Sequence, residues 1–152
     1  MSYLPRVLII EARFYPEIAD AMVSGAVKTL KAAGYEYERL EVPGVFEIPA
    51  AITMVLNSAD SQTELTSYVG IIAFGCVIRG ETDHYDHVCR ESSRALMELT
   101  TKHMFAFGFG VLTCENRAQA ELRAAIDGKN KGGEAAEACI RMMAIKRRFG
   151  LI

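Results

Sequence analysis

The sequence predicts an α/β layer fold with a mostly parallel, four-stranded sheet, because stretches typical of strands alternate with stretches of helical periodicity. The chain has 152 residues, of which 51% are hydrophobic, so it can bury a core of ordinary size, and we expect one domain over 1–152. The net charge of −2 provides no basic field for nucleic acid. No run approaches the ~20 apolar residues that span a bilayer, so we expect no membrane partner.

Four stretches are predicted to be strands. Continuous apolar runs at Arg6–Glu11 and Val69–Ile78 indicate buried parallel strands. Tyr35–Val42 alternates, which is typical of a half-exposed strand at a sheet edge. His103–Leu112 is the fourth, with phenylalanines on one face and small residues, mainly glycine, on the other, a pattern that allows a neighbour or ligand to approach the backbone.

Apolar residues at helical spacing predict a helix after each strand and a further helix at the end of the chain. The stripes are Ile18, Met22, Ala26, Leu30 and Ala33; Ile48, Ala51, Ile52, Val55 and Leu56; a helix from about His84 to Lys102; Ala118, Leu122, Ala125 and Ile126; and Ala135, Ala138, Cys139, Met142, Met143 and Phe149. Gly34 should stop the first helix, and the fourth should end near Gly128. The polar stretch Asn57–Ser67 is predicted to be an exposed connection.

The cysteines point to a reducing compartment. Cys76, Cys89, Cys114 and Cys139 are widely spaced and form no CxxC pair. We therefore expect reduced, buried thiols and a cytoplasmic protein. The short apolar run near the start is followed by Glu11 and Arg13, so it is predicted to be a strand and not a signal peptide.

The stretch Phe74–Val88 carries the strongest functional signal. It is predicted to leave a buried strand, break at Arg79-Gly80 and open a helix with Thr82 or Asp83 as N-cap. Free N–H groups and the positive end of a helix dipole attract anions. His84, beside such a site, could move protons next to a bound phosphate or oxyanion, which predicts an enzyme.

Ligands of parallel α/β sheets bind at the carboxyl ends of the strands. In this chain those ends are Ala12–Tyr15, Pro43–Glu47, Val77–Thr82 and Thr113–Asn116. We therefore expect one site shared by the four loops.

The loop sequences resemble the 6,7-dimethyl-8-ribityllumazine synthase family, in the same order and over almost the whole chain. The resemblance rests on Arg13-Phe14, Val42–Pro49, Gly75–Asp86, Gly110–Thr113 with Glu115-Asn116 and Gln119-Ala120, and Asn130–Gly132. The Val-Ile-Arg-Gly…His-Tyr-Asp block is the most specific of these motifs.

The resemblance implies a flavodoxin-like three-layer α/β/α sandwich and a transferase of riboflavin biosynthesis. In this reaction 5-amino-6-(D-ribitylamino)uracil condenses with 3,4-dihydroxy-2-butanone 4-phosphate to give the lumazine, phosphate and water. It further implies no metal or organic cofactor, and active sites between subunits of a homopentamer, twelve of which form a 60-subunit shell in some members. Asp127–Asn130 lacks the Lys-Ala-Gly-Asn kink typical of shells, so we expect a free pentamer.

Substrate-binding roles follow from the matching positions. Phe14 is expected to stack on the pyrimidine, although by pattern alone it is an aromatic at the edge of the core. Val45, Phe46 and Glu47 are expected to hold the ribityl chain, with Val45 standing where alanine is commoner. The backbone of Cys76, Val77 and Ile78 is expected to recognise the uracil edge, and Phe109 to close the pocket from the neighbouring subunit, although its pattern alone is that of a core residue.

The resemblance also assigns the phosphate and proton-transfer groups. Glu81 and Thr82 are expected to bind phosphate through N–H groups and a hydroxyl, and Arg123 to anchor it from the neighbour, although its pattern alone is that of a solvated helix-face arginine. Asp83 should cap the helix and point away. The assigned proton-transfer group is His84. The supporting residues are Asp86, a candidate orienting partner near His84, and Lys131.

Three other interpretations remain open. His84 and His87 lie three residues apart on one helical face, but no third metal ligand stands at a useful spacing, so we expect no metal. A non-catalytic paralogue that binds flavin or lumazine would keep the same pocket. A receiver-type signalling domain would need an acidic cluster with a phosphorylatable aspartate, and only Glu11 lies near such a place.

Overall fold

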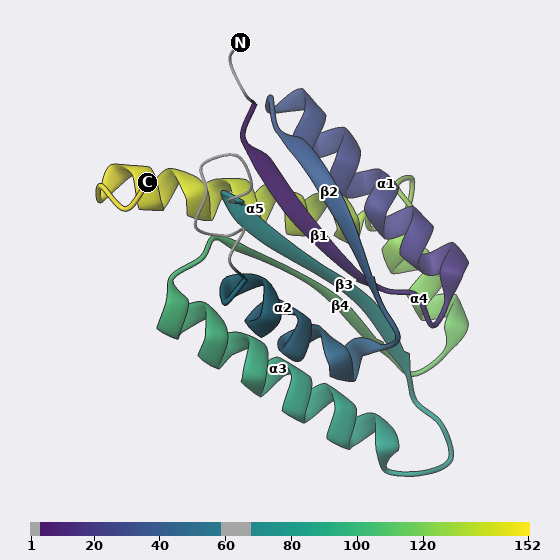
Figure 1. Cartoon of the computed structure of the whole chain (residues 1–152). Coiled ribbons are helices and arrows are strands. Elements are labelled where there is room, and N and C mark those ends of the chain that lie inside the picture. Colours follow the sequence, from purple (N-terminus) through teal and green to yellow (C-terminus); the bar gives the residue numbers. More distant parts are fainter. Residues whose placement is uncertain (1–3, 59–67) are drawn as a thin grey trace.

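The computed structural model describes residues 4–58 and 68–152, which form a four-stranded parallel sheet covered by helices on both faces (Figure 1). The strands are β1 (Arg6–Ala12), β2 (Glu36–Val42), β3 (Gly70–Ile78) and β4 (Phe107–Cys114). The helices are α1 (Pro16–Ala32), the 3₁₀ turn η1 (Val45–Glu47), α2 (Ile48–Leu56), α3 (His84–His103), α4 (Arg117–Ala124) and α5 (Lys131–Arg148). The predicted three-layer flavodoxin-like α/β/α architecture is confirmed.

The strand order is β2-β1-β3-β4, and every neighbouring pair is parallel. β2 therefore lies at an edge, as its alternating pattern predicts. The buried run of β1 is central, with Ile9 opposite Arg39 of β2 and Ile72 of β3. Much of the predicted connection at Asn57–Ser67 lies outside the described residues.

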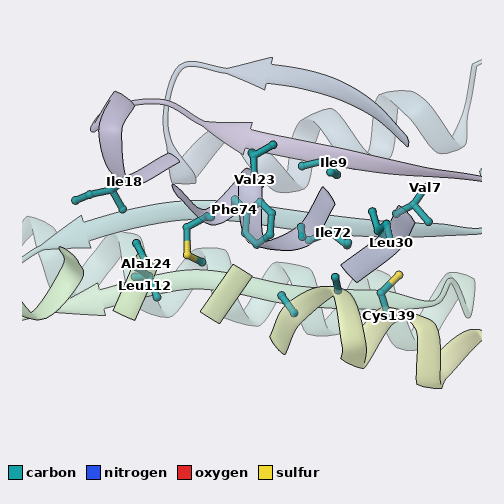
Figure 2. Packing of buried hydrophobic residues seen from close by; sticks show 14 of the residues in the cluster. Val7, Ile9, Ile18, Val23, Leu30, Ile72, Phe74, Leu112, Ala124 and Cys139 are labelled. Atoms are coloured by element: carbon teal, nitrogen blue, oxygen red, sulfur yellow. The ribbon is translucent and has the colours of Figure 1, made fainter. Parts of the chain in front are cut away.

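Each face of the sheet has its own core. Alternate residues of β1 and β3, including Val7, Ile9, Ile72 and Phe74, pack beneath α1, α4 and α5 (Figure 2). The residues between them, such as Leu8 and Ile10, pack with η1, α2 and α3 on the other face. This double burial explains the unbroken apolar runs of the central strands.

The prediction of the fourth strand began too early. α3 continues to His103 and ends at Met104, which adopts a left-handed conformation with φ 54°. The strand starts only at Phe107 and extends to Cys114, because residues of the run predicted as strand first complete the helix and its cap.

Two other boundaries moved. α4 ends at Ala124 and not near Gly128, because a tight turn follows in which Lys129 N–H donates to the Leu122 carbonyl (2.9 Å). α5 starts at Lys131, before the first apolar residue of its predicted stripe, because the side chain of Asn130 accepts the N–H of Gly133 (3.2 Å) and caps the helix.

A buried ion network lies at the carboxyl end of β1. Glu11 is 2% exposed, and its carboxylate accepts hydrogen bonds from Arg39 Nε (2.6 Å) and Arg13 Nη1 (2.6 Å). Burial alone would raise the pKa of Glu11, but the hydrogen bonds from Arg39 and Arg13 outweigh it and hold the pKa below its ordinary value of 4.5. Arg13 also binds Asp20 of α1 (2.8 Å), so the network joins β1, β2 and α1.

Glu11→Gln should lower the free energy of unfolding by about 1.5–3 kcal/mol, because the hydrogen bonds from two partly exposed guanidinium groups lose their charged acceptor. In the folded wild type, the Glu11 carboxyl stays ionised at pH values at which the same carboxyl takes up a proton in the unfolded chain. Its contribution is therefore present above pH 4.5 and is lost as the pH falls through the lower folded-state pKa. Denaturant unfolding across this range measures both effects. Glu98→Gln, at a carboxylate 68% exposed, is the control, and an equal acid sensitivity of Glu11→Gln and wild type would contradict the account.

None of the helices among the described residues is both long and apolar enough to cross a membrane.

Candidate active site

A cavity of about 350 Å³ opens at the carboxyl ends of β1 and β3. It is bounded by the β1–α1 turn, the segment around η1, the end of β3 and the start of α3. The lining residues are Phe14, Tyr15, Gly44, Val45, Phe46, Glu47, Cys76, Val77, Ile78, His84 and Val88. The structure thus brings together His84 and all the predicted pyrimidine- and ribityl-binding residues except Phe109.

The β1–α1 turn presents an aromatic ring to this cavity. Phe14 lies between the last residue of β1, Ala12, and Pro16, which starts α1. Its side chain is 72% exposed and contacts Tyr15 edge to face, with ring centroids 5.0 Å apart. The exposed ring can serve as a flat platform for a heterocycle.

The η1 segment adds a buried aliphatic wall and a carboxylate. Val45 is 6% exposed and packs so closely on β3 that a Cβ on Gly75 would collide with its Cγ2 atom. Glu47 is exposed, and no residue in the described part of the chain forms an ion pair or hydrogen bond with its carboxylate. This carboxylate can therefore accept hydrogen bonds from hydroxyl groups of a ligand.

The end of β3 offers its backbone to the cavity. Pairing with β1 ends at Phe74, opposite Glu11, whereas pairing with β4 continues to Ile78, opposite Cys114. The β1 side of Gly75–Ile78 thus lies beyond the β1–β3 ladder, and its peptide groups can pair with a planar ligand edge. The thiol of Cys76 is not reactive, because burial raises its pKa to about 12.

α3 starts at the mouth of the cavity with His84, which is exposed. The hydroxyl of Thr82 accepts the His84 N–H at 3.4 Å. Asp83 occupies the N-cap position, but its carboxylate pairs with His87 Nε2 (3.2 Å) and makes no capping bond, so the expected side-chain cap is wrong. In the first turn the N–H groups of Asp86 and His87 donate to the Asp83 carbonyl (3.0 and 3.3 Å). The N–H groups of Glu81, Thr82 and Tyr85 have no hydrogen-bond partner among the described residues and are accessible to an anion.

The other predicted residues lie elsewhere on the subunit. Phe109, Arg123 and Lys131 line a second cavity of about 350 Å³ between β4, α4 and α5. Phe109 is 47% exposed, Arg123 donates to the Gln119 carbonyl (3.1 Å), and Lys131 pairs with Glu134 (2.9 Å). The two cavities share no lining residue.

The expectation of one site shared by four loops is therefore wrong for a single chain. Thr113, at the end of β4, lines the second cavity and not the first. β4 lies at the far edge of the sheet, and its carboxyl end leads into α4, which packs on the α1 side. Strand-end topology groups the loops at one edge of the sheet but does not state which face each loop lines.

Three predicted residues line neither cavity. Glu81 and Thr82 are exposed in the loop before α3. Asp86, predicted to orient His84, instead lies against Arg79, with Oδ1 3.4 Å from Nη1. Over residues 4–58 and 68–152, no three His, Cys, Asp or Glu side chains gather as metal ligands do.

The four cysteines are free. Cys76, Cys114 and Cys139 are buried as predicted, whereas Cys89 is only half-buried on α3. Burial also raises the pKa of Cys139 to about 12, so this thiol is not reactive either.

Comparison with known proteins gives a consistent result over nearly the whole chain. The family model described as 6,7-dimethyl-8-ribityllumazine synthase matches residues 5–147. The chain belongs to the 6,7-dimethyl-8-ribityllumazine synthase family. Proteins of this name from Paramagnetospirillum magneticum and Bartonella tribocorum are 48% and 52% identical, over 97% and 99% of this chain and 99% and 95% of their own lengths. The one from Agrobacterium fabrum is 49% identical over 96% of this chain and 97% of its own length.

Three residues line the first cavity of this lumazine synthase family member although no role was predicted for them from the sequence. Tyr15, Gly44 and Val88 line the first cavity without having been singled out. Tyr15 and Gly44 lie inside the predicted strand-end loops Ala12–Tyr15 and Pro43–Glu47, but neither was given a role of its own. Val88 follows His84 by one helical turn, and the i, i+4 spacing could have identified it.

Proposed function

We propose that the protein condenses 5-amino-6-(D-ribitylamino)uracil with 3,4-dihydroxy-2-butanone 4-phosphate, giving 6,7-dimethyl-8-ribityllumazine, phosphate and water. The observation that carries this proposal is the first cavity, where a ring platform, an exposed carboxylate, an open backbone edge and an imidazole meet. These groups match the parts of the pyrimidine substrate, and the named relatives support the reaction.

Within this proposal the chain itself supplies binding and proton transfer. Phe14 stacks on the pyrimidine, the backbone of Cys76–Ile78 pairs with the uracil edge, and Glu47 accepts the ribityl hydroxyls. The N–H groups of Glu81 and Thr82 and the Thr82 hydroxyl hold the phosphate. The 5-amino group of the pyrimidine attacks the ketone carbon, and the first water leaves to form the imine. Phosphate is then eliminated, and the ribitylamino nitrogen attacks the remaining carbonyl carbon and closes the ring with loss of a second water. His84 moves the protons that these steps require.

We also propose a homo-oligomer, with the pentamer as the favoured state. Phe109 and Arg123 line the second cavity, which shares no residue with the first cavity of the same chain. Their proposed roles therefore need a second copy of the chain. Exposed apolar side chains on α4 and α5, such as Leu122 and Ile145, offer surface for such contacts. Sedimentation should give a particle of about five 16.7-kDa subunits. A monomer, or a 60-subunit shell, would contradict this assembly.

We further propose that the protein is cytoplasmic, which the four free thiols support.

The direct test is to mix the purified protein with both substrates and follow the absorbance or fluorescence of the lumazine together with phosphate release. Both signals should rise at equal rates. Lumazine binding without phosphate release would instead identify a non-catalytic binding protein.

A further inference from the structure

Arg79 lies at the junction between β3 and the loop that precedes α3, and no role has been assigned to its side chain so far. Its main-chain N–H donates to the carbonyl of Cys114 (2.9 Å), which extends the β3–β4 ladder by one bond. Its guanidinium makes contacts in three directions. Nε lies 3.1 Å from Glu115 Oε2, Nη1 lies 3.4 Å from Asp86 Oδ1, and the group stands over the Tyr85 ring, 4.3 Å from its centroid.

These contacts join two separate parts of the fold. Tyr85 and Asp86 belong to the first turn of α3, whereas Glu115 lies between β4 and α4. The N–H of Glu115 also donates to Gln119 Oε1 (2.9 Å), which ties it to α4. Arg79 therefore connects the start of α3 to the end of the sheet.

Little else holds this loop. Residues 80–84 are all exposed, and a Cβ added to Gly80 would meet nothing within 4 Å. The hydrogen bonds that the described structure shows for Gly80–Asp83 stay within the loop and the first turn of α3. The first buried residue of α3 is Val88, one turn after His84.

We propose that Arg79 is a positioning residue that holds Thr82 and His84 in register with the open edge of β3. This inference rests on the proposed function, because it concerns the same site. A guanidinium suits the role, since it binds two carboxylates along its edges while stacking on a ring, and a lysine ammonium cannot do all three. A displacement of about 1 Å at a reacting group can cost up to roughly 10²-fold in rate.

The test compares Arg79→Met and Arg79→Lys with Arg94→Met. Arg94 is the matched control, because it also pairs with two carboxylates, Glu91 and Glu98, but lies further along α3 and lines neither of the two cavities described above. Arg79→Met should lower kcat roughly 10- to 100-fold, with Arg79→Lys in between. The KM of Arg79→Met for the phosphate substrate should rise, while its KM for the pyrimidine should stay near the wild-type value. Exposed ion pairs add little to global stability, so the melting temperature should stay within about 4 °C.

Two further readouts separate positioning from a general structural role. In a His84→Ala background, Arg79→Met should have a much smaller effect on kcat, because the residues act through one another. Hydrogen exchange should become faster at the amides of Asp86 and His87, which the carbonyl of Asp83 accepts in the wild type (3.0 and 3.3 Å).

Each outcome is decisive. Unchanged exchange at these amides, or an unchanged kcat in an active protein, overturns the inference, as does an equal loss in Arg94→Met. If the wild type forms no lumazine, the proposed function fails, and with it any catalytic role for Arg79; the exchange measurement then still decides whether Arg79 orders the loop.

Discussion

Replacing His84 with alanine should lower kcat roughly 10²–10⁴-fold and leave measurable turnover. His84 supplies the imidazole of the first cavity and directly follows the loop that carries Glu81 and Thr82. Amine attack, imine formation and phosphate loss all move protons, and the variant would rely on water for them. Holding the two substrates together should still provide acceleration, so the variant should be slow and not dead.

His87→Ala is the matched control for this variant. His87 lies in the same helical turn, is exposed and pairs only with Asp83 among the described side chains, but it does not line the cavity. Steady-state assays with both substrates should show near-normal kcat for His87→Ala. Unchanged turnover in His84→Ala, or an equal loss in both variants, would remove His84 from the mechanism.

Arg123→Ala should raise the KM for the phosphate substrate roughly 10- to 100-fold, the effect of losing a hydrogen-bonded charge pair. The KM for the pyrimidine should change little, because Arg123 lies in the second cavity, away from Phe14 and Glu47. The KM of Arg123→Lys for the phosphate substrate should lie between those of Arg123→Ala and the wild type, since a lysine keeps the charge but not the bidentate geometry. Initial rates, measured while the concentration of one substrate is varied at a time, give both KM values.

The exposed Arg141 of α5 lines neither cavity, and Arg141→Ala should behave as wild type. An Arg123→Ala variant whose KM rises equally for both substrates would show a general defect and not the loss of a phosphate anchor.

The layers of the fold could be predicted because burial leaves a direct mark on the sequence. β1 and β3 are buried on both faces, so their apolar runs are unbroken, while the edge strand β2 alternates. Element ends were less predictable. Met104 ends α3 in a left-handed conformation without glycine, and the pattern before Phe107 resembles a strand although the chain is still completing a helix and its cap.

The candidate site could be predicted in part. The loop motifs named the residues that meet in the first cavity, including Phe14 and His84. Periodicity could not predict that Thr113 joins the opposite cavity, because face and edge depend on how α4 packs. The partner of Asp86 could not be predicted either, because several charged side chains lie near it in sequence and only the folded loop brings Arg79 next to it.

The central claim is that each active site combines the His84 cavity of one subunit with Phe109 and Arg123 of the next. It is tested most directly by co-expressing His84→Ala and Arg123→Ala subunits in one cell and assaying the purified mixed assemblies at low phosphate substrate. In a ring with random mixing, about a quarter of the interfaces would combine an intact His84 with an intact Arg123. Activity should then reach about a quarter of the wild-type value, far above either parent. Mixed assemblies no more active than the average of the two parents would contradict a site shared between subunits.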